Sequence, residues 1–322
     1  MHKLLRLLAI GTLAAFAFVA FPLSLSAQTF AYVTDSINGA DNVAVIDTSS
    51  NTIVAGVRVG SYPTGVAITP DGKRVYVASE ASDTVSVIDT SSNTVTATVK
   101  AGNNPDAIAI TPDGSRVYVT NPVDNQVSVI STFINRVVGT VKVGKVPHGA
   151  AINPDGTRAY ITNSNSSDVS VIDTFDNRVV ATVQVGFGPS GIAITPDGRR
   201  AYVGNGNEVV VIDTRDNRVV ARIKVGATPY GVAIAPDGRR AYVANLFSHD
   251  VSVIDTSTDT VVAAVQVGDH PFGIAVTPDG RRVYVANMES HDISVIDTSS
   301  NTVVATISGF VQPREIAITP LH

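Results

Sequence analysis

The feature that most constrains this chain is a phrase of 40 to 42 residues, repeated along almost its whole length. The tripeptide Pro-Asp-Gly recurs at intervals of 42, 42, 42, 40 and 42 residues, beginning at Pro70, Pro112, Pro154, Pro196, Pro236 and Pro278. A further 42 residues lead to Pro320, in the terminal sequence ITPLH. A fixed period of this length indicates a repeat architecture, in which each unit buries its apolar surface against its neighbours.

Each repeat contains four short strand-like segments. In the copy that begins at Gly231, GVAIA precedes the turn PDG, RAYVAN follows it, and DVSVID and VVAAVQV complete the unit. These segments are rich in β-branched residues, which favour strands, and PDG has the residues that tight turns use. Four strands in a unit of this length are typical of a propeller blade. We therefore predict an all-β, seven-bladed β-propeller of four-stranded blades over residues 28–322.

The order of segments at the two ends predicts how the ring closes. FAYVT, from Phe30, supplies the second strand of a blade that has no first strand before it. EIAIT, from Glu315, is a first strand with no blade after it. Because closure removes exposed sheet edges, we expect the C-terminal strand to join the N-terminal blade. In this copy the pair Arg314-Glu315 replaces the uncharged residues found at the same place in most other repeats.

The first 27 residues differ from the rest of the chain. A basic start, MHKLLR, precedes the apolar run Leu7–Leu23 and the small residues SLSAQ. This pattern is typical of a secretory signal peptide, residues 1–27, cleaved after Ala27. The alternative is an uncleaved membrane anchor, but the run is short for a spanning helix and Pro22 would interrupt one. We expect a periplasmic or cell-surface protein with no transmembrane segment after cleavage.

Composition excludes several kinds of site. The chain has no cysteine and no tryptophan, so it has no covalent c-type haem site, no thiolate nucleophile, no cysteine zinc site and no tryptophan-derived cofactor. Without residues 1–27 the chain carries 21 basic and 28 acidic residues. An acidic surface gives no electrostatic reason to expect nucleic-acid binding.

The repeated phrases VYVT, AYVA, TPDG and SVIDT resemble the YVTN family of β-propeller repeats over the whole of residues 28–322. The resemblance implies a seven-bladed propeller of an exported bacterial or archaeal cell-surface protein. Many members of that family have no assigned activity. More distantly, the chain is similar to other seven-bladed propellers, which include lactonases, streptogramin-type lyases and electron-transfer subunits.

Two sets of connections should lie on opposite faces of the propeller. The PDG and DTSSNT turns vary little, which indicates a structural face, whereas the loops that enter the first strand vary, and loops on a rigid scaffold often carry function. The residue after the recurring proline of the entry loop differs in every copy. It is Thr64, Asp106, His148, Ser190, Tyr230, Phe272 or Arg314. We predict that these seven residues surround one mouth of the axial channel.

The chemistry of this ring suits ligand binding. Arg314 could hold a carboxylate or a phosphate, and His148 could act as a general acid or base. Asp106 and Tyr230 add a carboxylate and a hydroxyl, and convergent polar groups in a concavity are typical of a binding site. The alternative is that the loops are merely solvated and tolerate variation.

A repeated SHD sequence provides weaker candidates for a metal site. His249 and His291 occupy equivalent positions in adjacent repeats, followed by Asp250 and Asp292. Imidazoles and carboxylates can share a divalent metal, but equivalent loops of adjacent blades diverge, and other copies also carry polar residues there. We therefore expect no cofactor, with a divalent metal at these residues as the alternative.

The interpretation we favour from sequence is an exported, monomeric, non-catalytic binding or interaction protein. Its variable loop face would engage a small ligand, a glycan or a periplasmic or envelope protein. One alternative is a periplasmic lactonase- or lyase-type enzyme with its site at the channel mouth. A second is an electron-transfer partner or a binder of a redox cofactor. Because one fold hosts many functions, only the site can separate these classes.

Overall fold

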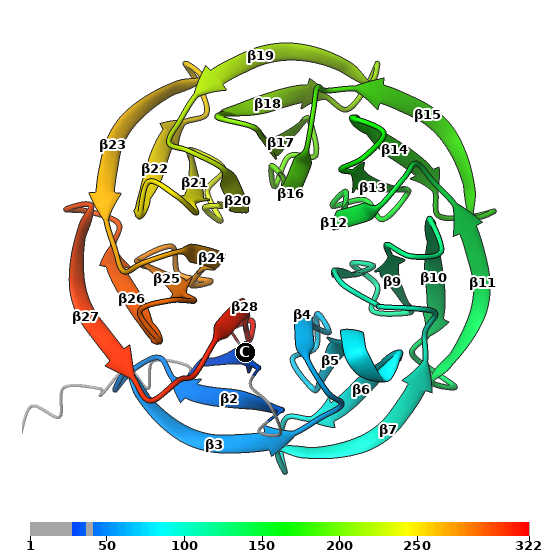
Figure 1. Ribbon diagram of the computed structural model, residues 1–322, viewed down its shortest axis with the longest axis horizontal. Coiled ribbons are helices and arrows are strands. Elements are labelled where there is room, and N and C mark those ends of the chain that lie inside the picture. The colour runs from blue at the N-terminus through cyan, green and yellow to red at the C-terminus, as the bar shows by residue number, and fades with distance from the viewer. Residues whose placement is uncertain (1–27, 37–40, 322) are drawn as a thin grey trace, which may run out of the picture.

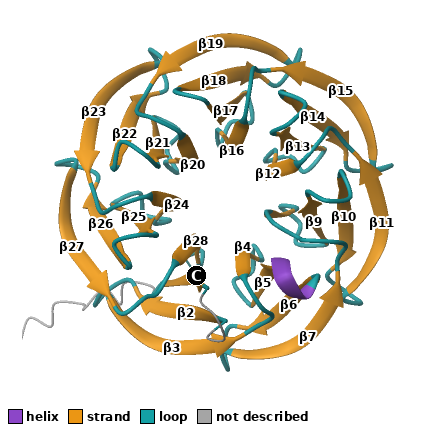
Figure 2. Cartoon of the chain, viewed as in Figure 1, coloured by secondary structure: helices purple, strands orange, loops and turns teal. Residues whose placement is uncertain are grey.

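Seven four-stranded antiparallel sheets surround a central axis (Figure 1). The computed structural model describes residues 28–36 and 41–321, so the predicted signal peptide lies outside the described residues. Within those residues the only helix is the short 3₁₀ turn η1 (Glu80–Ser82), drawn purple in Figure 2. None of the described helical structure is long and apolar enough to cross a membrane. The predicted all-β, seven-bladed propeller is confirmed.

Each blade contributes one strand to each of four concentric positions. The innermost strands are β28 (Pro313–Ile318), β4 (Pro63–Ile68), β8 (Ile108–Ile110), β12 (Pro147–Ile152), β16 (Pro189–Ile194), β20 (Pro229–Ile234) and β24 (Pro271–Val276). The second strands are β1 (Phe30–Asp35), β5 (Arg74–Ser79), β9 (Arg116–Asn121), β13 (Arg158–Asn163), β17 (Arg200–Asn205), β21 (Arg240–Asn245) and β25 (Arg282–Asn287). The third strands are β2 (Asn42–Asp47), β6 (Thr84–Asp89), β10 (Gln126–Ser131), β14 (Asp168–Asp173), β18 (Glu208–Asp213), β22 (Asp250–Asp255) and β26 (Asp292–Asp297). The outer strands are β3 (Thr52–Arg58), β7 (Thr94–Lys100), β11 (Arg136–Lys142), β15 (Arg178–Gln184), β19 (Arg218–Lys224), β23 (Thr260–Gln266) and β27 (Thr302–Ser308).

The apolar core lies between the blades. Tyr76 of β5 and Val85 of β6, for example, pack in one buried cluster with Val117 and Val119 of β9 in the next blade. Both faces of the second and third strands are therefore buried, which explains why their sequences are almost continuously apolar rather than alternating. Since each cluster joins two blades, no blade buries its apolar surface alone.

A recurring tyrosine and a recurring asparagine link neighbouring blades. The hydroxyl of Tyr76 donates to Oδ1 of Asn135 at 3.0 Å, and that of Tyr118 donates to Oδ1 of Asn177 at 2.7 Å. Asn135 and Asn177 have φ values of 49° and 55°, in the left-handed region that asparagine tolerates. The tyrosine of YVT and the asparagine of the DTSSNT turn thus form one interblade contact.

The C-terminal strand closes the ring. In Figure 1 the red β28 lies beside the blue first blade, where it pairs with β1 through Ala31 and Ile318, and through Val33 and Ile316. The carboxylate of Asp35 also accepts hydrogen bonds from the backbone amides that lead into β28. The closure predicted from the order of segments is confirmed.

Candidate functional site

The innermost strands approach one another closely at the axis. The residue after each ring position is glycine in five blades and alanine in one: Gly65, Ala107, Gly149, Gly191, Gly231 and Gly273. A Cβ atom at Gly191 would collide with the carbonyl oxygen of Tyr230, which belongs to the next blade. Small residues are therefore required where neighbouring inner strands meet.

Glu315 is the exception at this position. It lies on β28 and borders an axial cavity of about 110 Å³, whose other lining residues are glycines and apolar residues. Burial raises the pKa of Glu315 to about 7, and the negative charge of Asp106 adds to this effect, while His148 and Arg314 oppose it. Glu315 is not among the ring residues predicted from sequence, although it is the single charged residue among small ones at this position of the repeat, and that signal could have identified it.

Three members of the predicted ring form a hydrogen-bonded chain. Nδ1 of His148 contacts a carboxylate oxygen of Asp106, and Nε2 contacts the hydroxyl of Tyr230. The rings of His148 and Tyr230 meet edge to face, with their centres 5.0 Å apart. The side chains of His148 and Asp106 are 25% and 22% exposed, so part of this chain of groups remains accessible to water.

The surroundings of these groups change their pKa values. Burial acts to lower the pKa of His148, but the negative charges of Asp106 and Glu315 outweigh it, so the net direction is upward. Burial raises the pKa of Tyr230 well above its usual value, and Asp106 and Glu315 add to the increase. Perturbed acids and bases that influence one another are typical of catalytic sites.

A cation and three aromatic rings complete the mouth. The guanidinium carbon of Arg314 lies 4.3 Å from the ring centre of Tyr62 and 5.5 Å from that of Phe272. The rings of Phe272 and Tyr230 have centres 3.7 Å apart. Nε of Arg314 is buried and has no hydrogen-bond partner among the described residues. Tyr62 is not among the ring residues predicted from sequence, because it precedes the recurring proline rather than following it.

The other two predicted ring residues have a different role. Thr64 is 3% exposed, and its hydroxyl donates to the carbonyl oxygens of Pro105 and Asp106, each at 3.2 Å. Ser190 is 7% exposed and donates to the carbonyl oxygen of Pro229 at 2.6 Å. Their short side chains thus bond to the backbone of the next blade.

The remaining five ring residues touch one another in a continuous series. Together with Tyr62 we call them the mouth cluster, which consists of Tyr62, Asp106, His148, Tyr230, Phe272 and Arg314. Glu315 is adjacent to Arg314 in the chain and acts electrostatically on the same groups. The arrangement combines two acid–base groups, one cation and an aromatic wall.

The weaker metal candidates have structural contacts instead. Nδ1 of His249 accepts a hydrogen bond from the backbone amide of His270 at 3.2 Å. Asp250 and Asp292 each accept one from the asparagine side chain at the end of the preceding strand, at 2.6 and 2.7 Å. His249 and His291 have φ values of 56° and 61° and occupy a left-handed turn position. Over residues 28–36 and 41–321, no group of three His, Asp or Glu side chains is arranged to hold a metal.

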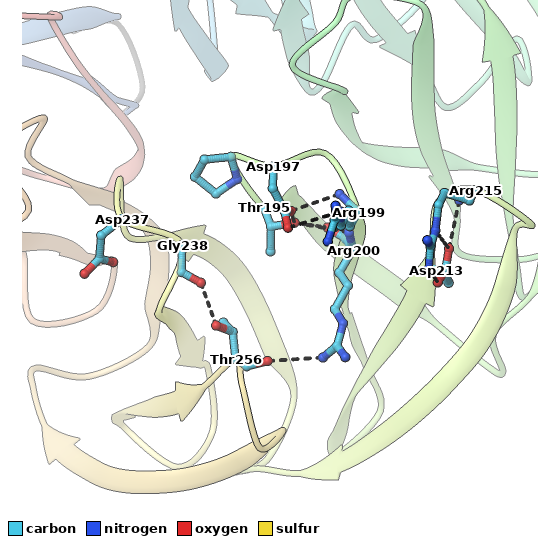
Figure 3. Close-up of a pocket in the computed structure, with 10 residues that line it drawn as sticks. Thr195, Asp197, Arg199, Arg200, Asp213, Arg215, Asp237, Gly238 and Thr256 are labelled. Carbon is cyan, nitrogen blue, oxygen red and sulfur yellow. Dashed lines mark hydrogen bonds and ion pairs between the residues drawn. The ribbon is translucent and has the colours of Figure 1, made fainter.

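Larger hollows occur on the opposite face, but they repeat from blade to blade. Figure 3 shows one of about 660 Å³, where the guanidinium of Arg200 reaches the carbonyl oxygen of Thr256 at 3.1 Å and Arg215 pairs with Asp213. Similar grooves lie between other blades, beside Arg116 and Arg240. These arginines bond to the backbone of the neighbouring turn, so the grooves follow the contacts between adjacent blades.

The fold and the mouth cluster define the class of this protein, a closed seven-bladed propeller with a polar site at one end of its channel. A family model described as "Lactonase, 7-bladed beta-propeller" matches residues 39–179 and 173–309. The chain therefore belongs to this lactonase family of seven-bladed propellers. No curated protein matches the chain.

Solved structures with the same fold are similar over most of the chain. A protein of unknown function from Desulfotomaculum acetoxidans DSM 771 has a TM-score of 0.80 and 21% identity, covering 91% of this chain and 99% of that one. A candidate 6-phosphogluconolactonase from Bacteroides uniformis ATCC 8492 has a TM-score of 0.77 and 17% identity, with coverages of 91% and 100%. The dihydro-heme d1 dehydrogenase NirN has a TM-score of 0.68 and 17% identity, with coverages of 89% and 74%. At these identities the likeness concerns the fold alone.

Family membership corrects one prediction. The favoured interpretation from sequence, a non-catalytic binding or interaction protein, is wrong, because the chain belongs to a family defined by lactonases. The mouth cluster gives the physical reason. A simple binding surface does not need a buried carboxyl that titrates near neutral pH beside an imidazole whose pKa is raised. The enzymatic alternative fits these observations better.

Proposed function

We propose that this protein is a lactone hydrolase and that its reaction takes place at the mouth cluster. The observation that carries the proposal is a carboxyl at the axial cavity, Glu315, whose pKa is about 7 and which acts electrostatically on a histidine held by Asp106. Family membership supports the reaction class. The cluster provides what hydrolysis of a cyclic ester needs, namely a base, an acid and a cation.

The two titrating groups have complementary roles in the proposed reaction. Water adds to the lactone carbonyl carbon, the ring C–O bond breaks, and a hydroxy acid results. Ionised Glu315 takes a proton from the attacking water, and protonated His148 gives a proton to the departing alkoxide. A general acid or base is most effective when its pKa lies near the working pH. The pKa of Glu315, raised by burial to about 7, meets this condition, and the net upward shift of the His148 pKa favours the protonated imidazole that the acid role needs.

Asp106 and Tyr230 position the imidazole. The Asp106 carboxylate holds Nδ1, stabilises the protonated ring and directs Nε2 toward Tyr230, as the carboxylate does in catalytic triads. The leaving oxygen of the substrate would approach Nε2 beside the Tyr230 hydroxyl. Asp106 is therefore a positioning residue in this scheme.

Arg314 and the aromatic rings define the substrate class. The guanidinium of Arg314, which lies over the rings of Tyr62 and Phe272, is suited to a carboxylate or phosphate on the substrate. The rings of Tyr62, Tyr230 and Phe272 would pack against the apolar face of the lactone. We therefore propose a small lactone that carries an anionic group.

The test is a pH-stat assay of γ- and δ-lactones, each with and without a carboxylate or phosphate substituent. We expect turnover of anionic lactones and a loss of about 10²–10⁴-fold in kcat/KM for Glu315→Gln. Glu289→Gln, an exposed carboxylate in a loop on the same face, is the control and should retain full activity. No turnover of any lactone by the wild type, or full activity in Glu315→Gln, would contradict the proposal.

We also propose that the chain is an exported YVTN-type member of the family. The repeated VYVT and AYVA phrases support the type of repeat, and the pattern of residues 1–27 supports export. N-terminal sequencing of protein recovered from a periplasmic extract should give Gln28 as the first residue. An N-terminus at Met1 would contradict cleavage.

A further inference from the structure

Three adjacent blades differ from the others in the turn between the third and the outer strand. In four blades the residue after Asp-Thr is serine, and the first residue of the outer strand is threonine: Ser49 and Thr52, Ser91 and Thr94, Ser257 and Thr260, and Ser299 and Thr302. In the other three both positions change together, to Phe133 and Arg136, Phe175 and Arg178, and Arg215 and Arg218. These turns join β10 to β11, β14 to β15 and β18 to β19, in consecutive blades (Figure 1). We call residues 131–136, 173–178 and 213–218 the turn sector.

The turn sector exposes apolar groups that the fold itself does not require. Phe133 is 93% exposed, Phe175 is 90% exposed and the neighbouring Ile134 is 51% exposed. Serine occupies the phenylalanine position in four equivalent turns, so the turn forms without an aromatic residue. Aromatic residues and arginine are enriched at protein interfaces, and serine is depleted there. The substitutions in these blades therefore indicate an interface.

Charge identifies the partner that fits this surface. The chain carries a net charge of −5, but the turn sector contains four arginines and four aspartates and is neutral. The corresponding turns of the other four blades contain aspartates and no basic residue. Two copies of an acidic molecule repel each other. Of the seven equivalent turns, those of the turn sector together carry no net charge, so two copies can approach each other there without net repulsion. In a two-fold arrangement, the arginines of one copy can also face the aspartates of the other copy.

The shape of the sector fits self-association as well. Phe133 borders a groove of about 1020 Å³ lined by Pro70 and Val138, and Phe175 borders the adjacent groove of about 420 Å³. In a two-fold dimer the same patch meets itself, so the protruding rings of one copy can face the grooves of the other.

From these observations we propose that the turn sector is a two-fold interface between two copies of this chain. This proposal departs from the monomer expected from sequence, which stays a prediction until the oligomeric state is measured. It leaves the mouth cluster open on the opposite face, and it does not depend on the proposed lactonase activity.

The test is sedimentation equilibrium of the chain without residues 1–27 over a range of concentrations. We expect a reversible dimer for the wild type. The double variant Phe133→Ser and Phe175→Ser should raise the dissociation constant about 100-fold or more, since buried aromatic anchors carry much of an interface's binding energy. Its circular dichroism spectrum should not change, because serine occupies the same turn elsewhere in the chain.

Phe187→Ser is the matched control, since Phe187 is 82% exposed but lies in an entry loop on the mouth face. This variant should dimerise like the wild type. A wild type that stays monomeric at high concentration would overturn the proposal, and so would a double variant that dimerises as well as the wild type. Binding of a monomeric wild type to anionic phospholipid vesicles would assign the sector to a lipid surface instead and would also overturn it.

Discussion

The ionised carboxylate of Glu315 lowers the stability of the folded protein, although the proposed reaction needs it. Its pKa is about 7 in the folded protein, compared with 4.5 for an unperturbed glutamate. Because the folded state favours the protonated carboxyl, this residue's contribution to stability is fully present below pH 4.5 and is lost as the pH rises to about 7. One pKa unit corresponds to about 1.4 kcal/mol, so ionisation should lower the free energy of unfolding by roughly 3–4 kcal/mol.

Replacing Glu315 with glutamine should therefore stabilise the protein, and it should also remove the proposed lactonase activity. At pH 8 we expect Glu315→Gln to melt about 5 °C above the wild type, and at pH 4 the two should melt together. Differential scanning calorimetry between pH 4 and pH 9 measures this difference. Glu289→Gln, which changes an exposed carboxylate, should follow the wild type at every pH. A constant offset between Glu315→Gln and the wild type would mean that burial of the carboxylate is not the cause.

Asp106 should determine the alkaline side of the pH–rate profile. Its charge raises the pKa of His148 against the lowering effect of burial, so Asp106→Asn should lower that pKa. If His148 must be protonated to act as the acid, the alkaline limb of kcat/KM should move to lower pH by about 1 unit. Asp269→Asn, whose carboxylate side chain is 69% exposed, should leave the limb where it is. An unshifted limb in Asp106→Asn would exclude His148 as the titrating acid.

At the scale of strands and turns, one contact explains two of the recurring residues. The Tyr118 hydroxyl and the Asn177 side chain join neighbouring blades at 2.7 Å. We expect Tyr118→Phe to lower the free energy of unfolding by about 1 kcal/mol, the usual contribution of such a bond. Asn177→Gly removes the acceptor, and glycine can still adopt the left-handed backbone. A double-mutant cycle in urea should give a coupling near 1 kcal/mol, and a coupling of zero would mean that the contact is not energetically linked.

The strands were predictable from sequence because recurring residues with a specific structural role mark where a strand begins or lies. Pro70 and Gly72 mark the tight turn, and the repeated tyrosine marks the second strand, so the blades and their order follow from the spacing. Side-chain direction does not follow in this way. Thr64 and His148 occupy equivalent backbone positions, yet the short hydroxyl of Thr64 bonds to the next blade, whereas the longer imidazole reaches the mouth.

The contents of the site were less predictable because they depend on contacts between blades far apart in the sequence. Tyr62 and Arg314 meet only after the ring closes, and the raised pKa of Glu315 arises from burial by other blades. The sequence does show that Glu315 departs from the small residues of its equivalents. It does not show that this carboxyl would act on His148, and the proposed catalytic role rests on that interaction.

At the scale of the whole molecule, ring closure and the candidate site share one element. β28 completes the first blade, where Ile316 packs in the same buried cluster as Ala31 and Val33. The same strand carries Arg314 to Tyr62 of the second blade and places Glu315 at the axis. An open ring would therefore lose the cation and the proposed base of the site together.

Deleting residues 313–322 should consequently cost much more stability than its ten residues suggest. The deletion exposes the apolar edge of β1 and removes the Thr319 contacts with Phe30. We expect the melting temperature to fall by about 10 °C or more, with aggregation through the free edge. Calorimetry and light scattering measure both effects. Deleting only Leu321 and His322, which follow the strand, should change neither, and a peptide of residues 313–322 added in trans should recover part of the loss. A melting temperature within about 2 °C of the wild type for the longer deletion would show that the seven blades hold together without their terminal strand.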